Sequence, residues 1–224
     1  MANLHGKPML WHVWNRVRQS PFIESVILAV DNEEVYETAK SWGAMCKLTA
    51  DSYHCGTARI ASIVDTLDAE LIINVQADEC CIDVRLLEQM IEAYSVRPSG
   101  LITPITRFNS LEDLQDPNKV KVVINHERRA LYFSRQVIPY DRDGFIDLNT
   151  ENLPYFWHIG VYGYERKILE RYHELPESYL EQMEKLEQLR FLEAGIPVYT
   201  FETEYHTLAV DTLKDLERVE QLVR

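Results

Sequence analysis

Leu71–Glu79, with the sequence LIINVQADE, is the stretch that decides the fold. Four of its first five residues are apolar, and the run ends abruptly at QADE, residues 76–79. A continuous apolar run that ends in polar residues is typical of a strand buried on both faces of a parallel sheet. Ligands of open α/β sheets bind just beyond the carboxyl ends of such strands, where a carboxylate could hold Mg²⁺. On the pattern alone, a solvated loop starting at Asp78 and Glu79 fits equally well.

Around this stretch, the first half of the chain alternates between helix and strand patterns. The expected elements are helices at Leu10–Gln19, Glu33–Trp42, Gly56–Leu67 and Val84–Tyr94, and strands at Ser25–Val30 and Ala44–Thr49. Strands and helices that alternate at this spacing are typical of parallel βαβ units. The pattern therefore predicts an α/β fold.

The second half carries strand patterns with little helix between them. They lie at Gly100–Thr106, Lys119–Asn125, Arg129–Ser134 and Tyr155–Tyr164, and two helices close the chain at about Tyr179–Glu193 and Leu213–Val223. Clustered strands indicate an antiparallel extension of the sheet, at about residues 100–164. With Asp141–Pro154 as the expected loop and no linker in sight, we predict one domain over residues 1–224.

Composition limits the possible functions. The 224 residues carry a formal net charge of −13, which disfavours nucleic acid as a partner because its phosphates would be repelled. No apolar run reaches the length of a membrane span and no export signal is visible, so we expect no membrane insertion and a cytoplasmic location. None of the four cysteines has zinc-ligand spacing, and small apolar fillers are their default interpretation.

Three aspartates follow apparent strand ends: Asp31 after SVILAV, Asp78 after LIINVQ and Asp211 after HTLAV. Two such carboxylates facing one crevice would form a site for a divalent metal ion. Asp211 also precedes an apolar-periodic helix, so capping of that helix would explain it alone. The two roles are compatible.

Polar residues of a possible pocket lie in three further segments. The run HCGTAR, residues 54–59, sits between a strand and a helix, and it could receive an anion or a base edge, although a plain turn is the commoner meaning of one glycine. At period two, His158, Gly160, Tyr162 and Tyr164 share one face, as a pocket wall or as core. For Glu187, Gln188 and Arg190 the default is a solvated helix face.

Nine segments in one order carry a family resemblance: GKPMLWHVWNR, ILAVD, LTADSYHCGTAR, IINVQADE, DPNKVKVV, ALYFSRQVIPYDRD, HIGVYGY, LEQLR and AVDTLKDLERV. They span almost the whole chain. Three of them are specific to one family among the sugar nucleotidyltransferases: ALYFSR followed by IP, HIGVYGY and LEQLR. By these motifs the chain resembles the CMP-Kdo synthetases, the 3-deoxy-manno-octulosonate cytidylyltransferases of lipopolysaccharide or capsule assembly.

The resemblance implies a Rossmann-like nucleotidyltransferase sheet with an antiparallel extension that forms a homodimer. It implies the reaction of CTP with Kdo, a 2-keto-3-deoxy sugar acid, to give CMP-Kdo and pyrophosphate with Mg²⁺. Its catalytic metal ligands fall on Asp78 and Asp211. Its nucleotide contacts fall on His54, Cys55, Gly56, Arg59 and Gln76. Its sugar-acid contacts fall on Arg135, His158, Tyr162, Glu187 and Gln188.

The chain also departs from the family pattern. The triphosphate-wrapping loop PAR-x-x-S-x-R-x-PGKP and its strand are absent from these 224 residues, GDEP is replaced by ADEC, and SGTER by CGTAR. We therefore expect the chain to be weakly active or inactive with CTP, and sugar-acid binding to outlast catalysis. Met1 as an internal start is one explanation. Others are a diverged or truncated non-catalytic homologue that binds a sugar acid or a protein, or a cytidylyltransferase for an amino analogue of Kdo. The aromatic strand Tyr155–Tyr164 is expected to offer apolar surface to the dimer.

Overall fold

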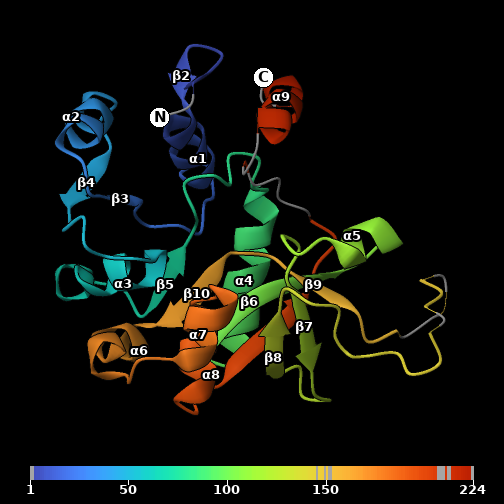
Figure 1. The fold of residues 1–224 in the computed structure, drawn as a ribbon. Helices are drawn as coiled ribbons and strands as arrows, with labels where there is room; N and C mark the ends of the chain where they lie inside the picture. Colours follow the sequence, from blue (N-terminus) through green and yellow to red (C-terminus); the bar gives the residue numbers. More distant parts are fainter. Residues whose placement is uncertain are drawn as a thin grey trace.

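The computed structural model describes residues 3–144, 146–148, 150, 153–205, 210 and 213–222. Within this part the chain is organised around a mixed sheet of seven strands (Figure 1). The order along it is β5 (Leu71–Asn74), β10 (Tyr162–Glu165), β6 (Leu101–Arg107), β9 (Phe156–His158), β7 (Lys121–Ile124) and β8 (Ala130–Ser134), with β11 (Val198–Glu202) paired to β6. The α/β class is confirmed.

Strand β6 is the centre of the sheet, and its first six residues are all buried. On one edge it pairs in parallel with β11, from Leu101 to Ile105. On its other edge it pairs antiparallel with two strands in succession, β10 at Leu101 and Ile102 and then β9 from Ile105 to Arg107. Since β9 continues to β7 and β10 continues to β5, this shared edge joins the two halves of the sheet.

The single strand expected at Tyr155–Tyr164 is wrong, because it is interrupted at residues 159–161. The break lies opposite Pro104, whose carbonyl accepts the N–H of Ile159 at 3.1 Å but which has no N–H to return. The Thr103 hydroxyl donates instead to the carbonyl of Val161 at 2.8 Å. A proline and a threonine on β6 therefore divide one aromatic strand into β9 and β10.

The Leu71 strand also differs from its prediction. Strand β5 ends at Asn74, pairs antiparallel with β10 and alternates between half-buried and buried residues. The prediction that this strand lies in a parallel sheet is wrong, because β10, part of the aromatic stretch, lies between it and β6. The parallel pair in the first half is a separate two-stranded sheet, formed by β3 (Ile27–Val30) and β4 (Met45–Leu48). A two-stranded sheet of β1 (Asn3–Leu4) and β2 (Lys7–Pro8) lies near the start of the chain.

Helices cover both faces of the large sheet. The helices of the described residues are α1 (Met9–Val17), α2 (Glu33–Ser41), α3 (Gly56–Ala61), α4 (Val84–Val96), α5 (Leu111–Gln115), α6 (Arg166–Glu170), α7 (Tyr179–Glu184), α8 (Gln188–Glu193) and α9 (Leu213–Leu222), with short 3₁₀ turns at Val64–Thr66 and Tyr172–Glu174. Not all of them lie on the large sheet, since α2 packs against β3 and β4 and α1 lies beside β2. The helix expected at Tyr179–Glu193 is two helices, because Lys185 adopts a left-handed conformation with φ 55°. None of the helices in the described ranges is long and apolar enough to cross a membrane.

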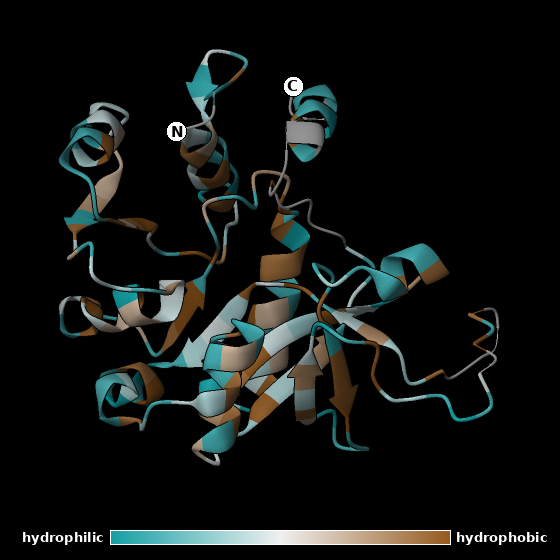
Figure 2. Ribbon diagram, viewed as in Figure 1, coloured by the Kyte–Doolittle hydropathy of each residue, from teal (hydrophilic) through white to brown (hydrophobic). Residues whose placement is uncertain are grey.

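The sheet separates two apolar clusters, and neighbouring residues of β6 point into different ones. Ile102 packs with Leu86 and Met90 of α4, whereas Leu101 packs with Tyr164 and with Phe191 of α8. Figure 2 shows hydrophobic residues along β5, β7 and α4. The stretch Tyr155–Tyr164, which was expected to offer apolar surface to a dimer, is largely buried within the chain. The tyrosines at both of its ends are 5% exposed or less.

Gly163 is where β10 is squeezed between its neighbours. It pairs with both Ile73 and Ile102, and a Cβ built on it would lie 2.7 Å from Cγ2 of Ile102 and 3.2 Å from Sδ of Met90. We expect Gly163→Ala to lower the free energy of unfolding by about 1–3 kcal/mol through overpacking, measured by urea denaturation. Gly160→Ala is the matched control, because its nearest neighbour would be 3.9 Å away, at Glu79. Equal stability of the two variants would contradict this packing.

Candidate functional site

The loop between β4 and α3 is held against the end of β5. Cys55 caps α3, with its Sγ accepting the N–H of Ala58 at 3.4 Å. A Cβ on Gly56 would lie 3.0 Å from Nε2 of Gln76 and 3.1 Å from Nδ2 of Asn74. Only glycine allows the loop to approach these two amides so closely. The structure thus brings Cys55, Gly56 and Gln76 together, while His54 is exposed beside them.

After the break between α7 and α8, one polar side chain reaches the same loop and the next reaches β10. Oε2 of Glu187 accepts the N–H of Thr57 at 3.1 Å, and Oε1 of Gln188 accepts the hydroxyl of Tyr162 at 3.0 Å. The hydroxyl of Tyr164 lies 2.6 Å from that of Thr57, and its ring stacks on Tyr162 with centroids 5.9 Å apart. These contacts form a closed set across α3, β10 and the start of α8. We call its five residues the polar ring: Thr57, Tyr162, Tyr164, Glu187 and Gln188.

Two buried atoms of the polar ring have no hydrogen-bond partner within the described part of the chain. They are Oε1 of Glu187 and Nε2 of Gln188, and Gln188 is 1% exposed. A buried polar atom without a partner costs about 1–3 kcal/mol, so such atoms mark places where a ligand or water completes the network. One acceptor and one donor on adjacent residues suit a ligand with hydroxyl groups.

His158 lies behind the polar ring and is neutral. Its Nε2 is 2.9 Å from the Thr103 hydroxyl, whose single hydrogen goes to the carbonyl of Val161, so Nε2 carries the proton and Nδ1 remains as the acceptor. Its ring contacts Tyr162 with centroids 5.3 Å apart. Burial lowers the pKa of His158 to about 3, because the charged imidazolium would lose its hydration.

The hydroxyl and thiol groups of the site also stay protonated. Burial, and then the charge of Glu187, raises the pKa of Tyr162 and of Tyr164 well above the usual range of tyrosine. The same two causes raise the pKa of Cys55 to about 11. Its Sγ lies 3.4 Å from the hydroxyl of Tyr172. The site is therefore built to hydrogen-bond a polar ligand rather than to attack one with a thiolate.

Arg135 is placed differently from the other predicted sugar-acid contacts. Its Nε donates to the carbonyl of Glu184 at 2.8 Å, one terminal nitrogen donates to the carbonyl of Pro117 at 3.1 Å, and its backbone N–H reaches the Glu184 carboxylate at 3.0 Å. These bonds fasten the end of β8 to the end of α7, just before the break that presents Glu187. Arg135 as a ligand of a substrate carboxylate stays a prediction.

Arg59 joins α3 to the small parallel sheet. It pairs with Asp31 at 2.6 Å and donates to the Thr49 hydroxyl at 2.6 Å. Asp31, one of the three strand-end carboxylates, is thus committed to an arginine.

Asp78 lies in a turn directly after β5, half-buried. Its carbonyl accepts the N–H of Val210 at 3.3 Å, so the end of the chain meets this turn. Asp211 itself lies outside the described residues, as does its expected role as a helix cap. Among the residues that are described, no group of three or more His, Cys, Asp or Glu is arranged to hold a metal ion. One or two carboxylates with substrate phosphates are the usual magnesium ligands, so the donor set at Asp78 remains suitable.

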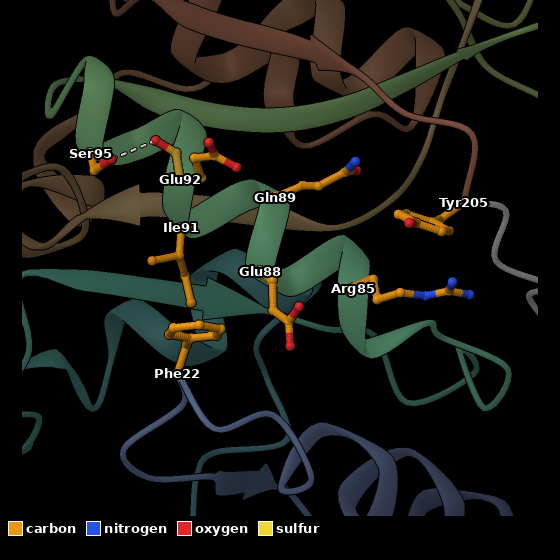
Figure 3. Close-up of a pocket in the computed structure, with 8 residues that line it drawn as sticks. All are labelled: Phe22, Arg85, Glu88, Gln89, Ile91, Glu92, Ser95 and Tyr205. Carbon is orange, nitrogen blue, oxygen red and sulfur yellow. Dashed lines mark hydrogen bonds between the residues drawn. The ribbon is translucent and has the colours of Figure 1, made fainter.

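A hollow of about 500 Å³ lies on the outer side of α4, away from these residues (Figure 3). Arg85 stacks over the ring of Tyr205 at 4.4 Å there, and Glu88 and Glu92 line the same groove. Its arginine is already paired with Asp83, and it holds none of the residues described above. We therefore place the candidate site at the polar ring.

The structure adds Thr103 and Tyr172 to the site, which were not predicted from the sequence, and Thr57, which was predicted only as part of the run at residues 54–59. Thr57 lies inside the run HCGTAR, so its place beside Gly56 was a usable signal. Nothing in the sequence pattern distinguishes Thr103 within its apolar strand or Tyr172 within its short turn.

Comparison with known proteins gives one consistent result. A family model described as cytidylyltransferase matches residues 1–203. The chain is 41% identical to a 3-deoxy-manno-octulosonate cytidylyltransferase of Solibacter usitatus, covering 100% of this chain and 87% of the relative. It is 39% identical to one from Koribacter versatilis, covering 100% and 83%. A solved CMP:2-keto-3-deoxy-manno-octonic acid synthetase in complex with CTP superposes with a TM-score of 0.89 at 36% identity, covering 99% of this chain and 89% of that one.

The lowered pKa of His158 gives a test of its burial. In the unfolded protein His158 has a pKa near 6.5, whereas in the folded protein its pKa is about 3, so between these values only the unfolded state binds the proton. Its contribution to stability is therefore fully present above pH 6.5 and is lost as the pH falls toward 3, by about 1.4 kcal/mol per unit. We expect His158→Gln to flatten the dependence of the unfolding free energy between pH 6.5 and 5. His126→Gln, in the exposed turn after β7, controls for loss of any histidine; parallel slopes for wild type and His158→Gln would refute the assignment.

Proposed function

The chain belongs to the family of 3-deoxy-manno-octulosonate cytidylyltransferases, and we propose that it transfers a cytidylyl group from CTP to a 2-keto-3-deoxy sugar acid of the Kdo class. The products are the CMP-sugar acid and pyrophosphate. The observation that carries the proposal is the polar ring, because it joins the loop matched to nucleotide binding with the residues matched to sugar-acid binding. This set of contacts supports adjacent sites for the two substrates.

The sugar acid is assigned to the polar ring and His158. The unsatisfied Oε1 of Glu187 accepts from one sugar hydroxyl, and the unsatisfied Nε2 of Gln188 donates to an oxygen. Tyr162, whose hydroxyl is held by Gln188, and neutral His158, whose ring contacts Tyr162, supply further polar groups in fixed positions. A polyhydroxylated ligand both donates and accepts, so it matches this mixed set better than an apolar or a purely anionic ligand does.

The nucleotide is assigned to residues 54–59 and Gln76. Gly56 lets the backbone approach the Gln76 amide, which can both donate to and accept from a base edge. Arg59 is fixed by Asp31 and Thr49, so its part is to hold the loop in place as well as to add positive charge. Thr57 ties this loop to Glu187, which sets the distance between base and sugar acid.

Asp78 and Asp211 are proposed to hold Mg²⁺. The carbonyl of Asp78 binds the residue before Asp211 along the chain, which supports a joint role. Bound there, the ion would neutralise charge on the triphosphate of CTP. The chain's own side chains then have to align the anomeric hydroxyl with the α-phosphate. Fixing two reactants in this way removes much of the entropic cost of a bimolecular step.

Homodimer formation through residues 100–164 is part of the proposal. The aromatic strand is buried within the chain, so the surface available to a partner lies beside it. Leu131 on β8 is 58% exposed and Tyr140 in the following loop is 86% exposed. Exposed apolar residues of this size on one extension are typical of an interface between subunits.

The first test is pyrophosphate release from CTP and Kdo with Mg²⁺. We expect Asp78→Asn to lower turnover by on the order of a hundredfold or more, because a neutral amide is a poor magnesium ligand. Asp68→Asn, an exposed aspartate in the loop before β5, should turn over like the wild type. Equal turnover of the two variants at saturating Mg²⁺ would remove Asp78 from the metal site. No release by the wild type, with sugar acid still bound in calorimetry, would favour a non-catalytic homologue.

The second test concerns the dimer. We expect Leu131→Glu to shift the protein toward monomer in light scattering at micromolar concentration, because a charge would be buried in the interface. Val96→Glu is the control, since Val96 is 82% exposed at the end of α4 and outside the extension. A monomeric wild type, or a dimer that tolerates Leu131→Glu, would contradict this interface.

A further inference from the structure

Two adjacent thiols, Cys80 and Cys81, follow Asp78 and Glu79, and the proposed reaction gives them no role. Both are free cysteines. They are the two central residues of a tight turn, because the N–H of Ile82 donates to the carbonyl of Glu79 at 3.0 Å. A four-residue turn reverses the chain over its central residues, so the two side chains start from neighbouring Cα atoms on a sharply bent backbone.

The two thiols differ in access. Cys80 is 0% exposed and packs in the apolar cluster with Leu4 and Ile82, whereas Cys81 is half-buried and reachable from solvent. Cys81 is therefore the residue that a small oxidant reaches first, and Cys80 is its immediate neighbour in the chain. An exposed thiol next to a second one is the arrangement of a cysteine that is oxidised and then resolved. Of the remaining cysteines, Cys46 lies on β4 and Cys55 contacts Tyr172.

We propose that Cys80 and Cys81 form a reversible vicinal disulfide when a hydroperoxide oxidises the protein. The Cys81 thiolate attacks the peroxide, whose O–O bond breaks to leave a sulfenic acid and one molecule of water or alcohol. The Cys80 sulfur then attacks the Cys81 sulfur, an S–S bond forms and water leaves. In total, two thiols lose two protons and two electrons, and one peroxide is reduced by them.

The bond is expected to be easily reduced. Neighbouring Cα atoms across a trans peptide are about 3.8 Å apart, whereas those of ordinary disulfides are about 4.4–6.8 Å apart. The ring of a vicinal disulfide is therefore strained, and strained disulfides have more oxidising potentials and are the labile ones. A thiol such as dithiothreitol should reopen it readily.

Closing the ring acts on the turn that carries Asp78. The N–H of Glu79 donates to the carbonyl of Gln76 at 3.2 Å, and the carbonyl of Asp78 accepts from Val210. Closing the ring changes the backbone torsions of Cys80 and Cys81. Because Glu79 directly precedes Cys80, this change acts on the hydrogen bonds of Glu79 and Asp78. We therefore expect oxidation to lower turnover; this consequence, unlike the disulfide itself, rests on the proposed function.

The disulfide is tested on the full chain without any substrate. After treatment with hydrogen peroxide, mass spectrometry should find the protein two hydrogens lighter, and peptide mapping should place the bond between Cys80 and Cys81. Dithiothreitol should restore the starting mass. Cys46→Ser should behave like the wild type, whereas Cys81→Ser, or Cys81→Ala should the serine variant fold poorly, should not lose the two hydrogens. Irreversible sulfinic acid on Cys81 with Cys80 still open to alkylation, or a bond to Cys46 or Cys55, would overturn the proposal.

The coupling is read separately, as pyrophosphate release before oxidation, after oxidation and after reduction. We expect turnover of the wild type and of Cys46→Ser to fall several-fold and to return on reduction. The fall should be absent in Cys81→Ser. A disulfide that forms without changing turnover of an active enzyme would keep the modification site but overturn its coupling to Asp78.

Discussion

The Thr103 hydroxyl is the contact on which the rest of the site depends. It donates to the carbonyl of Val161 and accepts from Nε2 of His158, both at the point where the aromatic strand is broken. With Pro104 unable to donate on the same edge, the strand turns away from the regular ladder and resumes as β10. This one buried hydroxyl therefore sets the tautomer of His158 and the position from which Tyr162 and Tyr164 project.

From that position the tyrosines connect three elements that lie far apart in the sequence. Tyr164 reaches Thr57 at the start of α3, and Tyr162 reaches Gln188 at the start of α8. Glu187 then binds back to Thr57. Because the contacts close on themselves, a ligand that orders one side orders the other at lower entropic cost. This is the physical reason to expect that sugar acid and nucleotide bind with mutual support.

The sequence was sufficient to locate many of the elements, but β11, α5 and α6 were not predicted, and it was insufficient for their arrangement. Apolar runs located β3, β4, β5 and β6, and period two put His158 with Tyr162 and Tyr164 on one face, as their ring contacts confirm. Strand order is not a local property, so the insertion of β10 beside β5 could not be read from LIINVQADE. Similarly, Lys185 adopts the left-handed conformation that divides the helix pattern at Tyr179–Glu193. It is neither Gly nor Asn, the residue types that would have predicted such a break. The role of Asp78 came from its place at a strand end and from the family resemblance, that of Arg135 as a sugar-acid ligand came from the resemblance, and both stay predictions.

The most direct test of the central claim, that the polar ring is the sugar-acid site, is calorimetry with Kdo and separately with CTP. Gln188→Glu keeps the shape of the side chain and its acceptor toward Tyr162, but it replaces the unsatisfied donor Nε2 with a negatively charged oxygen. We expect a loss of at least about tenfold in affinity for the anionic sugar acid, with CTP affinity close to that of the wild type, in a protein that still folds but whose unfolding free energy is lowered by the buried charge. Unchanged affinity for the sugar acid in a folded Gln188→Glu protein, or a loss confined to CTP, would contradict it.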